Sequence, residues 1–226
     1  MKISQTLQFL ALALVPILFT SCASSIHYSA STLLDETSLH HEIAIVPVEI
    51  NFSGPVSTRL TYDDYRQLDI QESHFYQESL YNSLLRKANK NVKVDIQSIE
   101  RTNAILRDQK ISVQDSWSMD PAKLAEILKV DAVVKVRIEE SRYLTNAAGF
   151  GLELGRAVIF GPYNGPLPAG PVKTADVRAS CSIFDGDSGD LLWKMGVDQD
   201  ANWSYTPSEI IESLNRRIAR KFPYKW

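Results

Sequence analysis

The spacing of apolar residues changes several times along the chain, and each change marks a predicted element. Residues 42–50 are a short, mostly β-branched run that predicts a buried strand, with Pro47 near its end. Between residues 65 and 89 the apolar side chains recur at roughly helical spacing, which predicts a helix. Residues 92–96 alternate like a second strand, and residues 98–107 follow as a short helix.

The middle of the chain predicts a helix that leads into a strand. Residues 111–119 show no clear period and are predicted to form a loop. Asp120 and Pro121 then begin a helix, because aspartate caps free backbone amides and proline fits the first helical position. Residues 130–138 are apolar at first and then alternate with charged residues, which is typical of a strand. A short helix followed by such a strand indicates an α/β fold.

The last part of the chain predicts a hairpin and a closing helix. Residues 174–185 and 190–198 alternate in polarity around a glycine-containing turn, which predicts two antiparallel strands. A capping box at residues 206–209 begins an amphipathic C-terminal helix. The predicted order is β-α-β-α-α-β, a long loop, then β-β-α, in one α/β domain over residues 42–226. An α+β arrangement stays open.

The first 21 residues have the pattern of a signal peptide. Lys2 supplies the positive start, and residues 7–19 are apolar except for Gln8. This run is shorter than the roughly 20 residues that a membrane-spanning helix needs, but it has the length of a signal-peptide core. We therefore expect residues 1–21 to be removed during export.

The end of this run resembles the lipobox of bacterial lipoproteins, in which small residues precede a cysteine. The residues that the lipoprotein signal peptidase would recognise are Leu18, Phe19, Thr20 and Ser21, followed by Cys22. Phe19 stands where the family usually has leucine. The resemblance implies cleavage before Cys22 and attachment of diacylglycerol and a palmitate-type acyl chain. Each buried CH₂ contributes about 0.8 kcal/mol, so several chains hold a protein firmly on a membrane.

The residues after the lipobox suggest where in the cell the protein is located. Ala23 follows Cys22, where an aspartate is typical of inner-membrane retention in enterobacteria, so the resemblance favours the outer membrane with the domain in the periplasm. Residues 22–41 are rich in serine and threonine and are predicted to be a lipidated, flexible tether. Cys181 is the other cysteine and lies in a predicted strand, so we expect a core residue and no disulfide.

Three stretches of the chain resemble a group of envelope lipoproteins. They are residues 43–48 (IAIVPV), 120–138 (DPAKLAEILKVDAVVKVRI) and 183–194 (IFDGDSGDLLWK). The group includes the curli-secretion channel lipoprotein (CsgG-like), lipoproteins that activate penicillin-binding proteins (LpoB-like) and a related lipoprotein family of unknown function. The resemblance implies a mixed sheet flanked by helices and an accessory or assembly role that is not enzymatic.

Segment 145–173 is rich in glycine and proline and is predicted to be a long loop. Channel-forming members of the group insert extra hairpins into the membrane, and this segment is the candidate for such a hairpin here. Its prolines interrupt the second strand that a membrane hairpin needs, so we do not expect a pore. Its exposed aromatic side chains suggest instead a partner-binding face. The aromatic residues concerned are Phe150, Phe160 and Tyr163.

Composition and charge argue against one class of partner. The hydrophobic fraction of 44% is ordinary for a globular protein. The formal charge is −3, and loss of Lys2 with the signal peptide leaves 23 basic and 27 acidic residues. We therefore expect no nucleic-acid partner, because phosphate binding needs a basic surface.

A search for catalytic, cofactor or metal sites gives no candidate. Gly149, Gly151 and Gly155 do not have the spacing of a dinucleotide-binding fingerprint. The four histidines lack the i, i+4 spacing of a helical metal pair, and the adjacent His40 and His41 would point to opposite faces of a strand. The remaining polar candidates are predicted to be turn formers or solvated charges. They are Asp185, Asp187, Asp190, Glu139 and Glu140.

These patterns together predict a lipid-anchored envelope lipoprotein with a non-catalytic binding or assembly role. The expected partners are the membrane, through the lipid on Cys22, and an envelope protein. A subunit of an outer-membrane secretion or export complex is the first alternative, and it would be an oligomer. An unrecognised enzyme is the second alternative.

Overall fold

The computed structural model describes residues 27–54, 62–91, 94–142, 173–202, 204 and 207–224. Its elements in chain order are β1 (His27–Ser29), α2 (Leu33–Leu39), β2 (Glu42–Ile45), β3 (Glu49–Ser53), α3 (Tyr62–Asn91), β4 (Asp95–Ile96), α4 (Ile99–Asp108), α5 (Val113–Ser118), α6 (Pro121–Leu128), β5 (Ala132–Arg142), β6 (Lys173–Asp185), β7 (Leu191–Asn202) and α8 (Pro207–Lys221). The described residues form one mixed sheet flanked by helices, which confirms the predicted α/β class.

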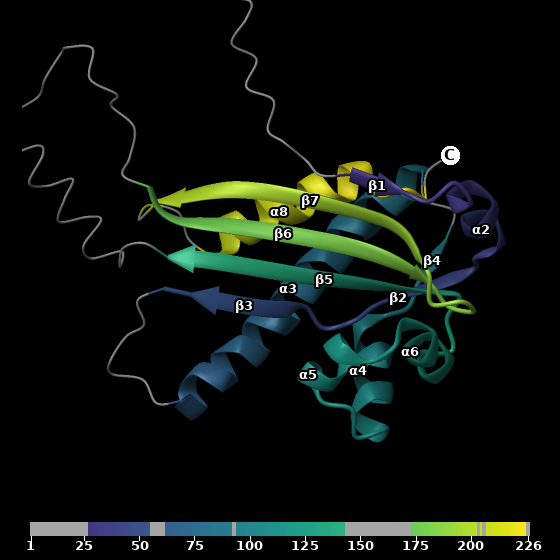
Figure 1. Cartoon of the computed structure of the whole chain (residues 1–226), viewed down its shortest axis with the longest axis horizontal. Helices are drawn as coiled ribbons and strands as arrows, with labels where there is room; N and C mark the ends of the chain where they lie inside the picture. Colours follow the sequence, from purple (N-terminus) through teal and green to yellow (C-terminus); the bar gives the residue numbers. More distant parts are fainter. Residues whose placement is uncertain are drawn as a thin grey trace, which may run out of the picture.

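The sheet has seven strands in the order β1-β7-β6-β5-β2-β4, with β3 also paired to β5 (Figure 1). β2 and β3 lie parallel to β5, and β4 lies parallel to β2. On its other side β5 pairs with β6 in the antiparallel sense, and β7 and β1 continue that half. β5 therefore joins a parallel half of the sheet to an antiparallel half.

A strand begins at residue 42 and its ladder stops before Pro47, as the sequence predicted, but a second strand follows where a single strand was predicted over residues 42–50. β2 ends at Ile45 and β3 begins at Glu49. Pro47 lies between them and has no backbone N–H to offer a neighbouring strand, so the ladder is interrupted there. Both pieces pair with β5, which is long enough to border first β2 and then β3.

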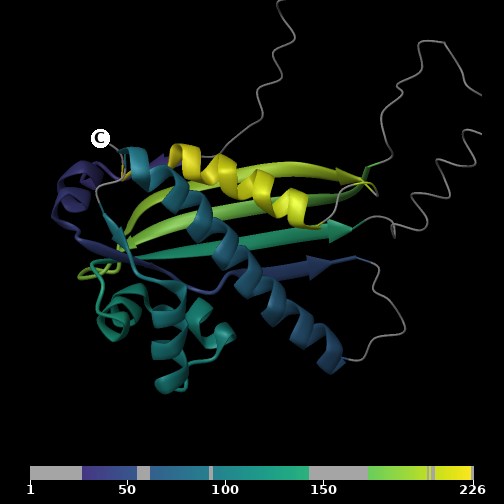
Figure 2. The same cartoon turned by 180° about the vertical axis from the view of Figure 1, so that it is seen from behind.

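Helices cover both faces of the sheet and bury two groups of apolar side chains. α3 and α8 lie across one face (Figure 2), where Leu80 and Leu84 pack with Leu214 and Ile218 in the main core. On the other face α4 and α6 bury a smaller cluster beside β2 and β5, which contains Leu106, Leu124 and Leu128. Removal of these side chains from water is the main force that holds the layers together.

The short helices begin at side-chain caps that the sequence provides. Ser98 caps α4, and Asp120 caps α6 with Pro121 in its first turn, as predicted. The loop predicted over residues 111–119 is wrong, because α5 forms there. Ser112 accepts a hydrogen bond from the Asp115 amide, and the Asp115 side chain accepts one from the Ser112 amide, so a capping box sets this single short helix.

The prediction of a flexible tether over residues 22–41 is wrong for residues 27–39, which form β1, α2 and the turn between them. β1 pairs with β7, and the indole Nε1 of Trp193 donates to His27 Nε2 at 2.8 Å. α2 follows and buries Leu33. Residues 27–39 thus belong to the folded domain, which begins closer to Cys22 than the sequence predicted.

Candidate functional site

Most residues that the sequence singled out for function lie outside the described residues. This holds for the lipobox and for segment 145–173 up to residue 172; Lys173 begins β6. The named residues concerned are Leu18, Phe19, Thr20, Ser21, Cys22, Phe150, Phe160 and Tyr163. Their roles stay predictions. Cys181 is fully buried and its burial raises the pKa of its thiol, which confirms the prediction of a core residue.

Two of the family-like stretches meet at one end of the sheet, around the side chain of Asp131. Asp131 Oδ2 accepts hydrogen bonds from the amides of His41 at 2.6 Å and Glu42 at 2.9 Å. Its carbonyl oxygen accepts the Gly186 amide from the β6–β7 turn at 2.8 Å. Burial opposes the ionisation of Asp131, but the two amide hydrogen bonds and the nearby rings of His40 and His41 together outweigh it and lower the pKa of the carboxyl.

Asp185 holds the same turn and reaches a buried histidine. Its Oδ2 accepts the amides of Asp187 and Ser188, and its Oδ1 lies 3.1 Å from His40 Nε2. His40 Nδ1 lies 2.6 Å from the hydroxyl of Tyr224. A neutral imidazole that donates from Nε2 to Asp185 and accepts the Tyr224 hydroxyl at Nδ1 satisfies all three groups. We call Asp131, Asp185, His40 and Tyr224 the hub.

The hub explains the aspartate cluster and the histidine pair of the sequence. Asp185 organises the turn as predicted, while Asp187 and Asp190 are exposed turn residues. His40 is buried and His41 is almost fully exposed, so the two adjacent histidines do face different ways. In the hub, His40, Asp185 and Tyr224 are each less than a tenth exposed, and their polar atoms bond one another, which is the arrangement of a structural network.

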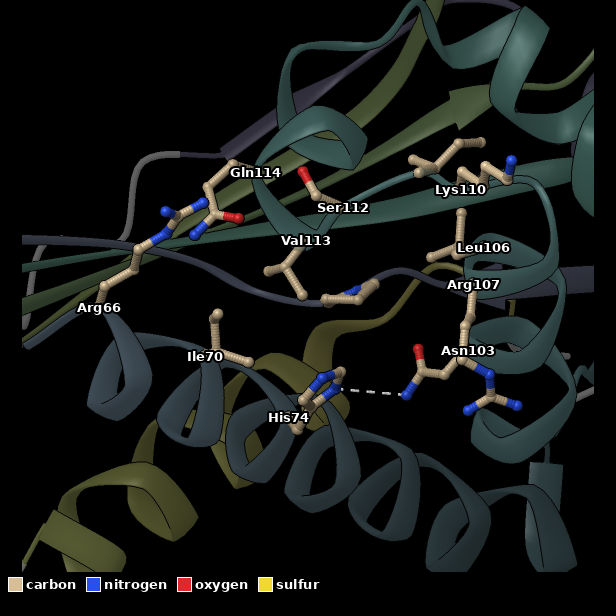
Figure 3. Close-up of a pocket in the computed structure, with 12 residues that line it drawn as sticks. Arg66, Ile70, His74, Asn103, Leu106, Arg107, Lys110, Ser112, Val113 and Gln114 are labelled. Atoms are coloured by element: carbon tan, nitrogen blue, oxygen red, sulfur yellow. Dashed lines mark hydrogen bonds between the residues drawn. The ribbon is translucent and has the colours of Figure 1, made fainter. Parts of the chain in front are cut away.

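A groove between α3, α4 and α5 is the strongest candidate for a binding site (Figure 3). It encloses about 460 Å³, within the size range of ligand pockets. Arg66 stands at one end beside Gln114, whereas Arg107 and Lys110 stand at the other end. None of the described residues that line the groove is acidic. Its apolar part is formed by Pro47, Ile70, Leu106, Ile111 and Val113.

The cations of the groove are not neutralised within the described part of the chain. No ion pair or side-chain hydrogen bond joins Arg66, Arg107 or Lys110 to another described residue. A second hollow of about 350 Å³ on the sheet surface differs in part. There Lys135 Nζ donates to two backbone carbonyls and Arg137 pairs with Glu49, so that among its lysines and arginines Lys194 alone lacks a described partner. The groove therefore keeps charge that a ligand can neutralise.

A buried amide pair fixes the middle of the groove. Gln77 is fully buried and donates to the carbonyl of Ile45 at 2.7 Å, while its amide and that of Asn103 bond each other at 3.1 and 3.0 Å. The second N–H of Asn103 lies 3.3 Å from His74 Nδ1. His74 Nδ1 also lies 3.4 Å from Gln77 Oε1, so Nδ1 either accepts from Asn103 or donates to Gln77, and in both cases Nε2 has no described partner.

Lys110 reaches the groove because of how α4 ends. The Lys110 amide bonds the carbonyl of Arg107, and the Ile111 amide bonds that of Leu106, which together form a Schellman motif. Lys110 occupies its left-handed position with φ of 57°, where glycine is favoured. Lys129 ends α6 in the same way with φ of 58°, but it does not line the groove.

Among the described residues, none of the helices combines the length and the apolar character that a membrane span requires. Within the same ranges, no three His, Cys, Asp or Glu side chains gather where they could hold a metal ion.

Comparison with known proteins finds solved structures of low similarity to this chain. No protein-family model and no curated sequence matches the chain. A PelC dodecamer from Paraburkholderia phytofirmans is 14% identical, with 86% of this chain and 93% of that chain covered and a TM-score of 0.41. Lipoprotein GNA1162 from Neisseria meningitidis is 12% identical, with coverage of 80% and 96% and a TM-score of 0.44. The LpoB C-terminal domain from Escherichia coli is 10% identical, with coverage of 71% and 83% and a TM-score of 0.39. Likenesses at this level assign neither a family nor a function.

Proposed function

We propose that the chain is a lipid-anchored lipoprotein of the bacterial envelope with a non-catalytic binding or assembly role. The observation that carries the proposal is the lipobox-like ending of an N-terminal signal sequence at Cys22. Ala23 after the cysteine supports the outer membrane, with the domain in the periplasm.

The start of the fold is compatible with an anchor at this cysteine. β1 begins at His27, five residues after Cys22. A fully extended link of this length reaches roughly 17 Å, so lipid on Cys22 would hold the β1 edge of the sheet close to the membrane. Three large apolar side chains are exposed in β1 and α2. They are Tyr28, Leu34 and Leu39.

The described polar clusters support binding in preference to catalysis. His40, Asp185 and Tyr224 of the hub are buried and bonded to one another, so a substrate would have to break these bonds to reach them. The groove offers unneutralised cations and an apolar floor, which suit the capture of a ligand by charge and contact. An envelope protein is the expected partner.

Intact mass and membrane fractionation of the wild type and of Cys22→Ala test this function. We expect the wild type to have lost 21 residues, to have gained the mass of diacylglycerol and an acyl chain, and to sediment with outer membranes. Cys22→Ala should lack the added mass and leave the membrane fraction. Equal mass and equal fractionation of the two proteins would contradict the anchor.

A subunit of a secretion or export complex is the alternative that the sequence resemblance supports. The size of the detergent-extracted protein separates the two functions. An accessory lipoprotein should elute near its chain mass plus the detergent micelle, whereas a ring-forming subunit should elute at many times 25.4 kDa.

A further inference from the structure

We propose that the groove between α3, α4 and α5 binds an acidic peptide segment in which an apolar side chain lies between two carboxylates. The inference deepens the binding role proposed above and rests on it. It names the site, the chemistry of the ligand and the residues that recognise it.

The charge of the groove sets the first requirement on the ligand. Arg66, Arg107 and Lys110 line it without a described counter-charge, although the whole chain carries a formal charge of −3. Cations that are kept free of partners on an acidic protein attract an anion and steer its approach. Arginine and lysine side chains recognise carboxylates through charge-assisted hydrogen bonds, which are stronger than neutral ones.

The arrangement of the groove sets the second requirement. The cations stand at its two ends, with Arg66 apart from Arg107 and Lys110 (Figure 3). Ile70 and Val113 line the same groove as these cations and form part of its apolar surface. A ligand that fills this space therefore carries two anionic groups and an apolar group between them. A volume of about 460 Å³ accommodates a few side chains of such a peptide.

A polar network fixes the His74 ring in the lining of the groove. Gln77 and Asn103 bond each other, Gln77 donates to the carbonyl of Ile45, and both side chains lie within hydrogen-bond distance of His74 Nδ1. The ring is thus oriented before a ligand arrives, which lowers the entropy lost on binding. Its Nε2 pairs with a peptide carbonyl or carboxylate oxygen when it carries the ring proton, and with a peptide N–H when Nδ1 carries it.

The position of the groove favours a protein partner over the membrane that holds the anchor. α4 and α6 pack beside β2, whereas β1 lies at the opposite edge of the sheet. Four strand spacings separate β1 from β2, which is roughly 19 Å. With the β1 edge held at the bilayer, the groove is directed away from the lipid headgroups, where a second protein can approach it.

The test uses the full-length protein in detergent micelles and a fluorescein-labelled peptide of the sequence Gly-Glu-Leu-Glu-Gly, followed by fluorescence anisotropy. A matched peptide carries glutamine in place of both glutamates. We expect the acidic peptide to bind and the glutamine peptide to bind at least about tenfold more weakly, because each charged hydrogen bond lost costs about this factor. Equal binding of the two peptides would overturn the proposal.

Two pairs of variants locate the binding. Lys110→Gly and Lys129→Gly remove the same charge from the same left-handed helix end, but only Lys110 lines the groove. Arg107→Gln and Arg216→Gln form the second pair, because Arg216 lies on α8 and does not line the groove. We expect the groove member of each pair to weaken the acidic peptide about fivefold or more and the control member to leave it unchanged. Equal losses of affinity within each pair would show an effect of net charge alone and would overturn the assignment of the binding to the groove.

Two competitors test whether a simple anion or a lipid headgroup, and not a peptide, supplies the negative charge that the groove binds. Inorganic phosphate that displaces the peptide at equal concentration would identify a simple anion site. Phosphatidylglycerol vesicles that displace the peptide, when phosphatidylcholine vesicles do not, would identify a lipid headgroup. Either result overturns the peptide ligand, and displacement by neither competitor supports it.

Lipid on Cys22 is measured separately by mass. A lipidated protein that fails to bind the peptide thus refutes this inference alone, and an unlipidated protein that binds it refutes the anchor alone.

Discussion

The hub and the groove are both polar, but they differ in how their charges are satisfied. In the hub, Asp131 and Asp185 accept backbone amides and His40 bridges Asp185 to Tyr224. In the groove, Arg66, Arg107 and Lys110 have no described partner. A saturated, buried network stabilises a fold, whereas unsaturated charge on a partly exposed wall is available to a ligand. The comparison predicts that hub variants change stability and that groove variants change binding.

The largest expected effect is at Gly186, which packs against Asp131 of the hub. A Cβ at this position would lie 2.5 Å from the carbonyl oxygen of Asp131, which is backbone and cannot swing away. We expect Gly186→Ala to lower the free energy of unfolding by about 2–4 kcal/mol. Urea unfolding followed by circular dichroism measures this. A loss below about 0.5 kcal/mol, the usual range of surface substitutions, would mean that the turn does not need its close approach to β5.

The next effect removes one hydroxyl from the hub. Tyr224→Phe keeps the ring that packs against Phe222 but leaves His40 Nδ1 buried without its partner. We expect a loss of about 1–2 kcal/mol in the free energy of unfolding, with binding of the acidic peptide unchanged. A variant as stable as the wild type would break the comparison, because the hub would then not be a stabilising network.

A smaller difference between the hub and the groove lies in their response to acid. The pKa values of Asp131 and Asp185 are lowered in the fold, because hydrogen bonds from amides and from His40 outweigh the effect of burial. Their stabilisation is complete above the unfolded value of about 3.9 and is lost as pH falls through the lower folded values. The free energy of unfolding should therefore fall below about pH 4, and Asp131→Asn should reduce this slope. An unchanged slope in that variant would contradict the account.

The smallest expected effect is a gain. Lys110→Gly and Lys129→Gly each relieve a left-handed backbone that lysine disfavours, so each should raise the free energy of unfolding by about 0.5–1 kcal/mol. Thermal unfolding of both variants measures it. Stability should rise in both, while peptide binding should fall only in Lys110→Gly. A gain confined to Lys129→Gly would show that Lys110 already forms a stabilising contact.

Local signals predicted much of the fold, and they failed where the evidence is distant in sequence. Asp120 and Pro121 marked the start of α6, and the turn glycines marked the hairpin of β6 and β7. β1 was missed because three residues show no period, and its place is set by pairing with β7. The capping box of α5, at Ser112 and Asp115, was present in the sequence and was overlooked.

The groove and the hub could not be predicted because their residues converge only in three dimensions. His40 and Tyr224 are 184 positions apart, and neither forms a motif with its neighbours. The groove takes its cations from α3 and from the end of α4, where single lysines and arginines look like ordinary surface residues. What distinguishes these cations from ordinary surface residues is that no described acidic residue lies against them. That depends on how the helices pack together and cannot be seen in the sequence.

The double pairing of β5 has a consequence for how the chain folds. Its antiparallel partner β6 continues into β7 through a short turn, whereas its parallel partner β2 pairs at Ile43 with Ala132, far away in sequence. The entropy of closing a loop grows with its length, so the hairpin half can form early and the parallel half must form late. In a chain made from its N-terminus, β1 emerges first and waits for β7, whereas β2 can pair with β4 before both β2 and β3 pair with β5. The oldest segment of the domain is therefore the one whose edges are exposed longest during biogenesis.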